Sequence, residues 1–168
     1  MTVFQNMYQC DLRILQWCVK TRDSKKFITL VRATSRTGDG FMQVLLPILV
    51  AGLTGSWSFV ILAALAFAIE RPLYFILKNS LKRKRPQDIV PDFQCIVCPS
   101  DKFSFPSGHT MAAFLLAGLC CAELSLIALP LYIWASAVGA SRVILGVHFP
   151  SDILAGAALG SVILIGIL

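Results

Sequence analysis

The chain has 168 residues, enough for one domain, and 57% of them are hydrophobic while only 14% are charged. With a mean hydropathy of +0.74, this composition excludes an ordinary soluble domain. The formal net charge of +6 must lie outside the apolar segments. There it favours anionic lipid or a phosphorylated ligand, and the basic stretches lack the aromatic interleaving of a nucleic-acid surface, which excludes that partner.

The first 40 residues predict two short amphipathic helices at the membrane interface. Apolar side chains recur at helical spacing over residues 8–34, with Ser24 as the N-cap of the second helix, and basic residues between them suit lipid headgroups. Residues 35–40 form a turn cluster that ends these helices. Since residues 1–9 are polar, we expect the first spanning helix to act as the insertion signal.

Five apolar segments then predict an all-α integral membrane protein with about five transmembrane helices in one bundle. The expected spans are residues 41–54, 57–78, 107–122, 124–145 and 150–168. The alternative for residues 41–69 is a single long, tilted helix. Pro130 is expected to kink the fourth span, whereas Pro150 suits the first turn of the fifth. Residues 1–40 are therefore an interfacial segment, and residues 41–168 the transmembrane domain.

The polar residues between the spans fall on one membrane face. The loop after the second span carries Lys78 and Arg85, the third span begins near His109, and the loop after the fourth carries His148 and Asp152. An antiparallel helical hairpin separates the last two groups, so all three emerge on the same side. Residues far apart in the sequence can therefore converge there.

Both histidines lie where a spanning helix begins. Ser107 has N-cap chemistry, Gly108 allows close backbone approach, and His109 follows beside amide groups that can bind an anion. Asp152, four residues after His148, can fix the tautomer of that ring and leave its other nitrogen free as a nucleophile. The alternative is two ordinary capped membrane helices with incidental histidines.

Three cations, Lys78, Arg85 and Arg142, are placed to bind phosphate opposite these histidines. For the neighbouring basic residues 82–84 we expect only attraction to anionic lipid.

Two further features have no predicted role. Arg71-Pro72 looks like Arg85-Pro86 but lies within the second span, where Glu70 is the expected partner of Arg71. Cys95 and Cys98 have the spacing of a metal or redox pair, but no second pair accompanies them, and a local disulfide is the alternative to a zinc site.

Together these motifs resemble the three-part signature of the type 2 phosphatidic acid phosphatases. The matching residues are Lys78-x6-Arg85-Pro86, Pro106-Ser107-Gly108-His109 and Ser141-Arg142-x5-His148-x3-Asp152. Their order and internal spacings all agree. The resemblance covers residues 78–152, and the turn at residues 35–40 is similar to bacterial members. The chain departs from larger members in having no obvious sixth span near its N-terminus.

The resemblance implies a phosphatase that uses neither a metal nor a cofactor. In that mechanism His148 attacks phosphorus and forms a phosphohistidine, Asp152 orients it, and His109 protonates the leaving oxygen and then activates water. The residues that would bind the phosphoryl oxygens are Lys78, Arg85, Ser107, Gly108 and Arg142. Supporting positions are Pro86, Pro106 and Ser141. The sequence also lacks the carboxylate cluster that a magnesium-dependent phosphatase needs.

The function that the resemblance implies is an integral membrane lipid phosphatase with no obligatory protein partner. Its substrate would be phosphatidic acid, phosphatidylglycerophosphate or undecaprenyl pyrophosphate. The alternatives are a lipid-phosphate binding or transport scaffold without turnover and, more remotely, a vanadate-dependent haloperoxidase. The positive-inside rule places the basic face in the cytoplasm. The resemblance instead implies a bacterial plasma membrane with the site facing the periplasm, and we adopt that expectation.

Overall fold

Helices form all of the regular structure in the computed structural model, which describes residues 3–20, 22, 24–91, 93–99 and 101–168. In chain order the elements are α1 Val3–Lys20, α2 Lys25–Thr37, α3 Gly40–Thr54, α4 Ser58–Leu81, α5 Pro86–Ile89, α6 Gly108–Leu124, the 3-10 helix η1 Ser125–Ala128, α7 Pro130–Ile144 and α8 Pro150–Ile167. The predicted all-α membrane fold is confirmed.

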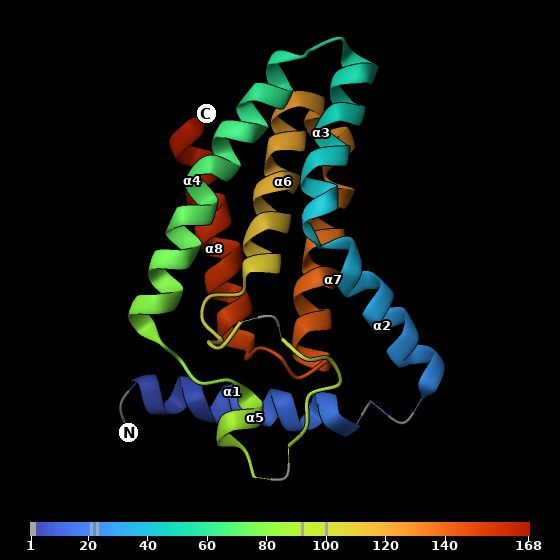
Figure 1. Ribbon diagram of the computed structural model, residues 1–168. Coiled ribbons are helices and arrows are strands. Elements are labelled where there is room, and N and C mark those ends of the chain that lie inside the picture. The colour runs from blue at the N-terminus through green and yellow to red at the C-terminus, as the bar shows by residue number, and fades with distance from the viewer. Residues whose placement is uncertain (1–2, 21, 23, 92, 100) are drawn as a thin grey trace.

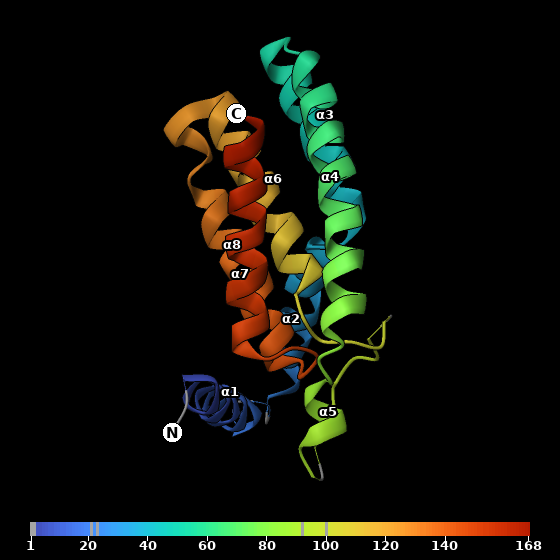
Figure 2. The same cartoon turned by 90° about the vertical axis from the view of Figure 1, so that its left-hand side faces the viewer.

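Helix α6 lies in the centre of the bundle, and α3, α4, α7 and α8 contact it (Figure 1; Figure 2 is turned by 90°). Most of its residues are small or apolar, and most are buried. Helix α8 packs closely against it because Gly156 and Gly160 face its backbone. A Cβ added at Gly156 would lie 2.6 Å from the backbone oxygen of Ser107. This contact fixes the start of α8 against the start of α6.

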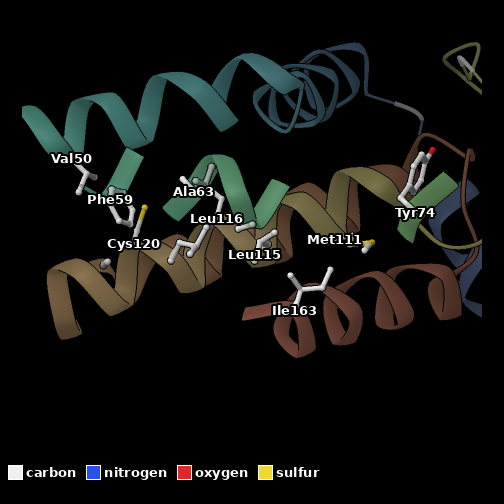
Figure 3. Packing of buried hydrophobic residues seen from close by; sticks show 12 residues of the cluster. Val50, Phe59, Ala63, Tyr74, Met111, Leu115, Leu116, Cys120 and Ile163 are labelled. Atoms are coloured by element: carbon white, nitrogen blue, oxygen red, sulfur yellow. The ribbon is translucent and has the colours of Figure 1, made fainter. Parts of the chain in front are cut away.

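The apolar core fills the space between α3, α4, α6 and α8. Met111 and Leu115 of α6 are fully buried in it, and Figure 3 shows α6 between Ala63 of α4 and Ile163 of α8. Tyr74 extends this cluster toward the end of the bundle where the polar residues gather. The packed core therefore holds the helix ends that carry the polar residues.

Helix α1 runs across this end of the bundle, roughly perpendicular to the other helices (Figures 1 and 2). Leu15 and Cys18 on one side of it pack against Val143 and Phe149, whereas Trp17 is 66% exposed. An amphipathic helix with an exposed tryptophan suits the interface between headgroups and acyl chains. Two N-terminal helices were predicted, and Ser24 caps the second by accepting a hydrogen bond from the amide of Phe27.

The structure decides between one helix and two over residues 41–69. Helix α3 ends at Thr54, Gly55 has a left-handed φ of 77°, and α4 begins at Ser58. Glycine adopts this conformation without the steric cost of a Cβ. The alternative of one long helix is therefore wrong.

Two local predictions need correction. The predicted turn at residues 35–40 does end α2, but it is shorter than predicted, because only Gly38 and Asp39 separate α2 from α3, and the two helices meet at a bend of 63°. Pro130 does not kink a helix, because it is the first residue of α7, where its missing N–H has no intrahelical partner to lose.

The five predicted spans correspond to α3, α4, α6, α7 and α8. Three segments of the described chain are long and apolar enough to cross a membrane, namely Ser58–Ile89, Gly108–Ala128 and Pro150–Ile167. The bent pair α2–α3 is a fourth if it counts as one span. Helices α3 and α7 each have 15 residues, which is fewer than the roughly 20 that a spanning helix needs. The number of crossings therefore stays a prediction.

Candidate active site

The predicted polar residues meet at one end of the bundle, where α4 ends, α6 begins and α7 connects to α8 (Figure 1). Lys78, Arg85, Arg142, His148 and Asp152 are all buried there. The predicted convergence of three distant segments is therefore confirmed. Burying several ionisable groups is unfavourable unless they pair with one another, so their partners define the site.

His148 and Asp152 face each other at the start of α8. Pro150 is the first residue of that helix, and Asp152 caps it by accepting a hydrogen bond from the amide of Phe149 at 2.8 Å. Nδ1 of His148 lies 3.6 Å from Oδ2 of Asp152. This distance is longer than a hydrogen bond, and Nδ1 is buried without a partner among the described residues.

The environment of His148 keeps its ring neutral. Burial lowers the pKa of His148 to about 4, the Asp152 carboxylate opposes this shift, and the charges of Arg85 and Arg142 reinforce it. A neutral ring has the free electron pair that a nucleophile needs.

This pKa gives a testable titration. A base with a lowered pKa stays neutral as the pH falls until that pKa is reached, so we expect His148 to remain neutral from neutral pH to about pH 5 and to become charged near pH 4. The chain has only two histidines, so NMR of ¹³C-labelled histidine resolves each one. The variant His109→Ala assigns the remaining signal to His148. A His148 midpoint near the ordinary 6.5 would contradict the buried, neutral ring.

Asp152 has further partners that hold its carboxylate. The hydroxyl of Ser104 donates to Oδ2, and the guanidinium of Arg83 donates to Oδ1 at 2.6 Å. The backbone oxygen of Asp152 accepts from the amide of Ser107 at 3.1 Å. The start of α8 is thus tied to the start of α6.

His109 lies in the first turn of α6, as predicted, and its partner is Asp39. Nε2 of His109 lies 2.9 Å from Oδ1 of Asp39, the residue before α3. The side chain of His109 is 27% exposed, so it is accessible from outside while His148 is not. This difference suits a group that exchanges protons with substrate and water.

Lys78 and Arg85 bind the same carboxylate, that of Asp101. Nζ of Lys78 lies 2.8 Å from Oδ2 of Asp101 and donates to the hydroxyl of Tyr74 at 2.6 Å. Arg85 donates to Oδ1 of Asp101 and, at 3.1 Å, to its backbone oxygen. Burial alone would raise the pKa of Asp101, but hydrogen bonds from Lys78 and Tyr74 and the two positive charges lower it to about 2. An anion therefore occupies the point at which both cations converge.

Arg142 is the third cation, and it is only partly satisfied. One of its Nη atoms donates to the hydroxyl of Ser35 at 2.7 Å, while its Nε is buried without a hydrogen-bond partner in the described part of the chain. Arg142 and His109 together line a cavity of about 390 Å³. A buried, unpaired donor beside a cavity indicates capacity for an anionic ligand.

The other predicted positions lie close to these groups. Ser107 is the N-cap of α6, but its hydroxyl pairs with that of Thr110 at 2.9 Å and does not cap the backbone, contrary to prediction. At Gly108 a Cβ would lie 2.7 Å from the ring of Tyr74, so this ring packs closely against the start of α6, and phosphate binding at Gly108 stays a prediction. Ser141 donates to the oxygen of Val138 within its own helix.

The two prolines of the motifs begin or precede helices. Pro86 is the first residue of α5 and follows Arg85 directly, and Pro106 is buried just before Ser107. Each sets the path of the backbone beside a predicted phosphate-binding residue. They do not themselves offer a donor to a ligand.

Glu70 and Arg71 form the predicted ion pair within α4. The guanidinium of Arg71 also lies 5.3 Å from the centre of the Tyr74 ring, so the pair is close to the site. The cysteines of the loop before α6, Cys95 and Cys98, are free thiols.

Several residues of this site were missing from the sequence prediction. They are Asp11, Ser35, Asp39, Tyr74, Arg83, Asp101 and Ser104. Tyr74 had a local signal, since it lies one helical turn before Lys78. The others come from loops or from the N-terminal helices, where spacing does not predict contact.

Comparison with known protein families places most of the chain in one group. The family model of the PAP2 superfamily matches residues 43–168. The chain is 41% identical over 113 residues to phosphatidylglycerophosphatase B of Bacillus subtilis, covering 60% of this chain and 52% of that protein. It is 30% identical over 99 residues to decaprenylphosphoryl-5-phosphoribose phosphatase of Mycobacterium tuberculosis, covering 56% and 51%. The chain thus spans about half the length of these relatives.

Two solved structures have a similar fold. One is the crystal structure of a transmembrane PAP2-type phosphatidylglycerolphosphate phosphatase from Bacillus subtilis, with a TM-score of 0.79 and 26% identity over 95% of this chain and 83% of that chain. The other is LpxE of Aquifex aeolicus, with a TM-score of 0.79 and 26% identity over 93% of each chain.

Proposed function

Since this chain belongs to the PAP2 superfamily, we propose that it is a metal-independent lipid phosphatase that works through a phosphohistidine at His148. The observation that carries the proposal is a buried, neutral histidine beside a carboxylate, with three cations and a second, accessible histidine around it. A binding scaffold needs the cations alone. Hydrolysis requires a nucleophile and a proton donor in addition to the cations.

In the first step Nε2 of His148 attacks phosphorus, and the bond from phosphorus to the leaving oxygen breaks. Nδ1 faces Asp152, so that carboxylate stabilises the charge that develops on the ring. His109 gives a proton to the leaving oxygen, so the lipid product leaves with a free hydroxyl group at that position. In the second step His109 accepts a proton from water, the water attacks phosphorus, and inorganic phosphate leaves as the electron pair returns to Nε2.

The cations hold the phosphoryl oxygens in both steps. Lys78 and Arg85 already bind a carboxylate, and the substrate phosphoryl group takes the place of Asp101 between them. The unpaired Nε of Arg142 supplies a further donor, and the backbone amide of Gly108, the first residue of α6, is another candidate. The amide of Ser107 is already bonded to Asp152. Positive groups fixed in advance stabilise the charge of the transition state without reorganising during the reaction.

The substrate we propose is phosphatidylglycerophosphate. Because His109 protonates the leaving oxygen, the leaving group must lie on its side, in the cavity that Arg32 and Arg36 also line. Guanidinium groups there suit a leaving group that carries a phosphate of its own. Phosphatidylglycerophosphate has such a phosphodiester, and phosphatidic acid does not. The relative named phosphatidylglycerophosphatase B supports the same choice.

A lipid panel tests this proposal. We expect purified, detergent-solubilised protein in EDTA to release phosphate faster from phosphatidylglycerophosphate than from phosphatidic acid or undecaprenyl pyrophosphate, with His148→Ala as the inactive control. Loss of turnover in EDTA would contradict the metal-free mechanism, and a different best lipid would contradict the substrate. Tight lipid binding without phosphate release by the folded protein would favour a scaffold.

We also propose that the site faces the periplasm of a bacterial plasma membrane. Cys98 is exposed in the loop beside the site, so it reports the side of the membrane on which the site lies. A variant that keeps only this cysteine should react with an impermeant maleimide in sealed spheroplasts. Reaction only after lysis would place the site in the cytoplasm.

A further inference from the structure

Arg83 lies in the connection between α4 and α5, where its neighbours behave differently. Lys82, with a left-handed φ of 47°, ends α4, and residues 82–85 are not helical. Outside the helix, exposed and inward-facing side chains alternate over these four residues. Lys82 and Lys84 are exposed, whereas Arg83 and Arg85 point inward, and the side chain of Arg83 is only 22% exposed. The expectation that residues 82–84 only attract lipid is therefore wrong for Arg83.

The guanidinium of Arg83 bridges two buried carboxylates. Nη1 lies 2.6 Å from Oδ1 of Asp152 and 2.7 Å from the hydroxyl of Ser151, and Nη2 lies 2.7 Å from Oδ2 of Asp11. Its Cζ lies 4.4 Å from the centre of the Phe149 ring. A planar group with forked donors suits this arrangement, because it can bond to two acceptors at once while its face covers an aromatic ring.

The backbone of Arg83 reaches the same carboxylate by a second route. Its carbonyl oxygen accepts from the amide of Ser104 at 2.8 Å, and the hydroxyl of Ser104 donates to Oδ2 of Asp152. One residue therefore fixes both oxygens of Asp152, one directly and one through Ser104. This leaves Oδ2 turned toward His148.

Asp11 connects this group to α1. Its Oδ1 accepts from the amide of Ser151 at 2.9 Å, and its Oδ2 accepts from the hydroxyl of Ser151 and from Arg83. Asp11 is itself buried. The helix across the end of the bundle is thus anchored to the first turn of α8.

We propose that Arg83 is a positioning residue for hydrolysis, because it holds the Asp152 carboxylate in the orientation that directs His148 toward the substrate. This inference rests on the proposed function of His148. Arg83 touches neither His148 nor, as we describe the reaction, the substrate. Groups that orient a catalytic residue from behind typically contribute about 10- to 100-fold.

The test separates positioning of Asp152 from anchoring of α1. Arg83→Gln loses the contacts with both carboxylates, whereas Asp11→Asn weakens the link to α1 and leaves the contact between Arg83 and Asp152. We expect Arg83→Gln to lower kcat about 10- to 100-fold with little change in KM, and Asp11→Asn to lower Tm with kcat within about threefold of wild type. The matched control is Lys84→Gln, which removes a neighbouring exposed charge and should leave kcat unchanged.

One further readout and one further variant distinguish positioning from a merely structural role. Removing the charge of Arg83 favours protonation of His148, so the acid limb of kcat/KM should move toward neutral pH in Arg83→Gln and stay in place in Lys84→Gln. If Arg83→Gln does not fold, Arg83→Lys keeps the charge but cannot span both carboxylates, and its kcat should still fall.

Either of two results would overturn the inference. One is a wild-type kcat in a folded Arg83 variant, and the other is an equal loss of kcat in Asp11→Asn and Arg83→Gln. The proposed function fails in a different way, through phosphate release that survives His148→Ala or is absent from wild type.

Discussion

Replacing His148 with alanine is expected to abolish phosphate release, by roughly 10⁴-fold or more, since the nucleophile is lost and water must attack the lipid phosphate unaided. The cations of Lys78, Arg85 and Arg142 would remain, so the variant should still bind the substrate. Turnover is measured as inorganic phosphate released from phosphatidylglycerophosphate in EDTA.

The stability of this variant needs its own control, because His148 is buried beside Asp152. His148→Gln replaces the ring with a polar side chain that fills more of the vacated space than alanine does. This variant should be as inactive as His148→Ala. A Tm close to that of wild type in either variant would show that activity was lost without unfolding. Phosphate release within about tenfold of wild type by a folded variant would contradict the role of His148.

Replacing His109 with alanine is expected to have an effect that depends on the leaving group. For a lipid alcohol, which leaves poorly without a proton, we expect a loss of about 10²- to 10⁴-fold in kcat. For p-nitrophenyl phosphate, whose leaving group needs no proton, formation of the phosphohistidine should be nearly unaffected. The rate of p-nitrophenol release in a single turnover measures that step separately from hydrolysis.

The side chain of His109 is partly exposed and bonds to the exposed Asp39, so its removal should disturb the fold little. Arg36→Ala is a suitable comparison, because it changes the same cavity without removing a proton donor. It should raise KM for phosphatidylglycerophosphate, whose leaving group lies in that cavity, and leave kcat on both substrates nearly unchanged. An equal loss on both substrates in His109→Ala would mean that His109 binds the phosphoryl group and does not act as the acid.

The amino-acid sequence was sufficient to predict which elements meet at the site. Apolar length predicted the helices, and the alternation of spans across a membrane placed Lys78, His109 and His148 at one end. Two predictions from local sequence were also confirmed, the proline that begins a helix and the carboxylate that faces a histidine four residues before it. Pro150 begins α8, and Asp152 lies in its first turn facing His148. Each of these predictions depends on residues close together in the chain or on the simple parity of antiparallel helices.

The contacts that complete the site could not be predicted in this way. Asp39 and Asp101 lie in connections between helices, and which cation or histidine each one meets depends on the three-dimensional path of the chain. Arg83 lies within a basic run that has the composition of a lipid-binding cluster. Only the end of α4 at Leu81, with the left-handed Lys82 as its cap, and the non-helical path of the chain after it bring Arg83 inward.

The proposed mechanism requires that phosphate passes through a covalent bond to His148, and this bond can be trapped. His109→Ala should form the phosphohistidine from p-nitrophenyl phosphate but hydrolyse it slowly, because the base that activates water is missing. Quenching in alkali, which preserves phosphohistidine, and mass spectrometry of the peptide containing His148 should then find a phosphate on that ring, and none in the double variant His109→Ala, His148→Ala. Release of p-nitrophenol by His109→Ala without any phosphorylated His148 would contradict the mechanism.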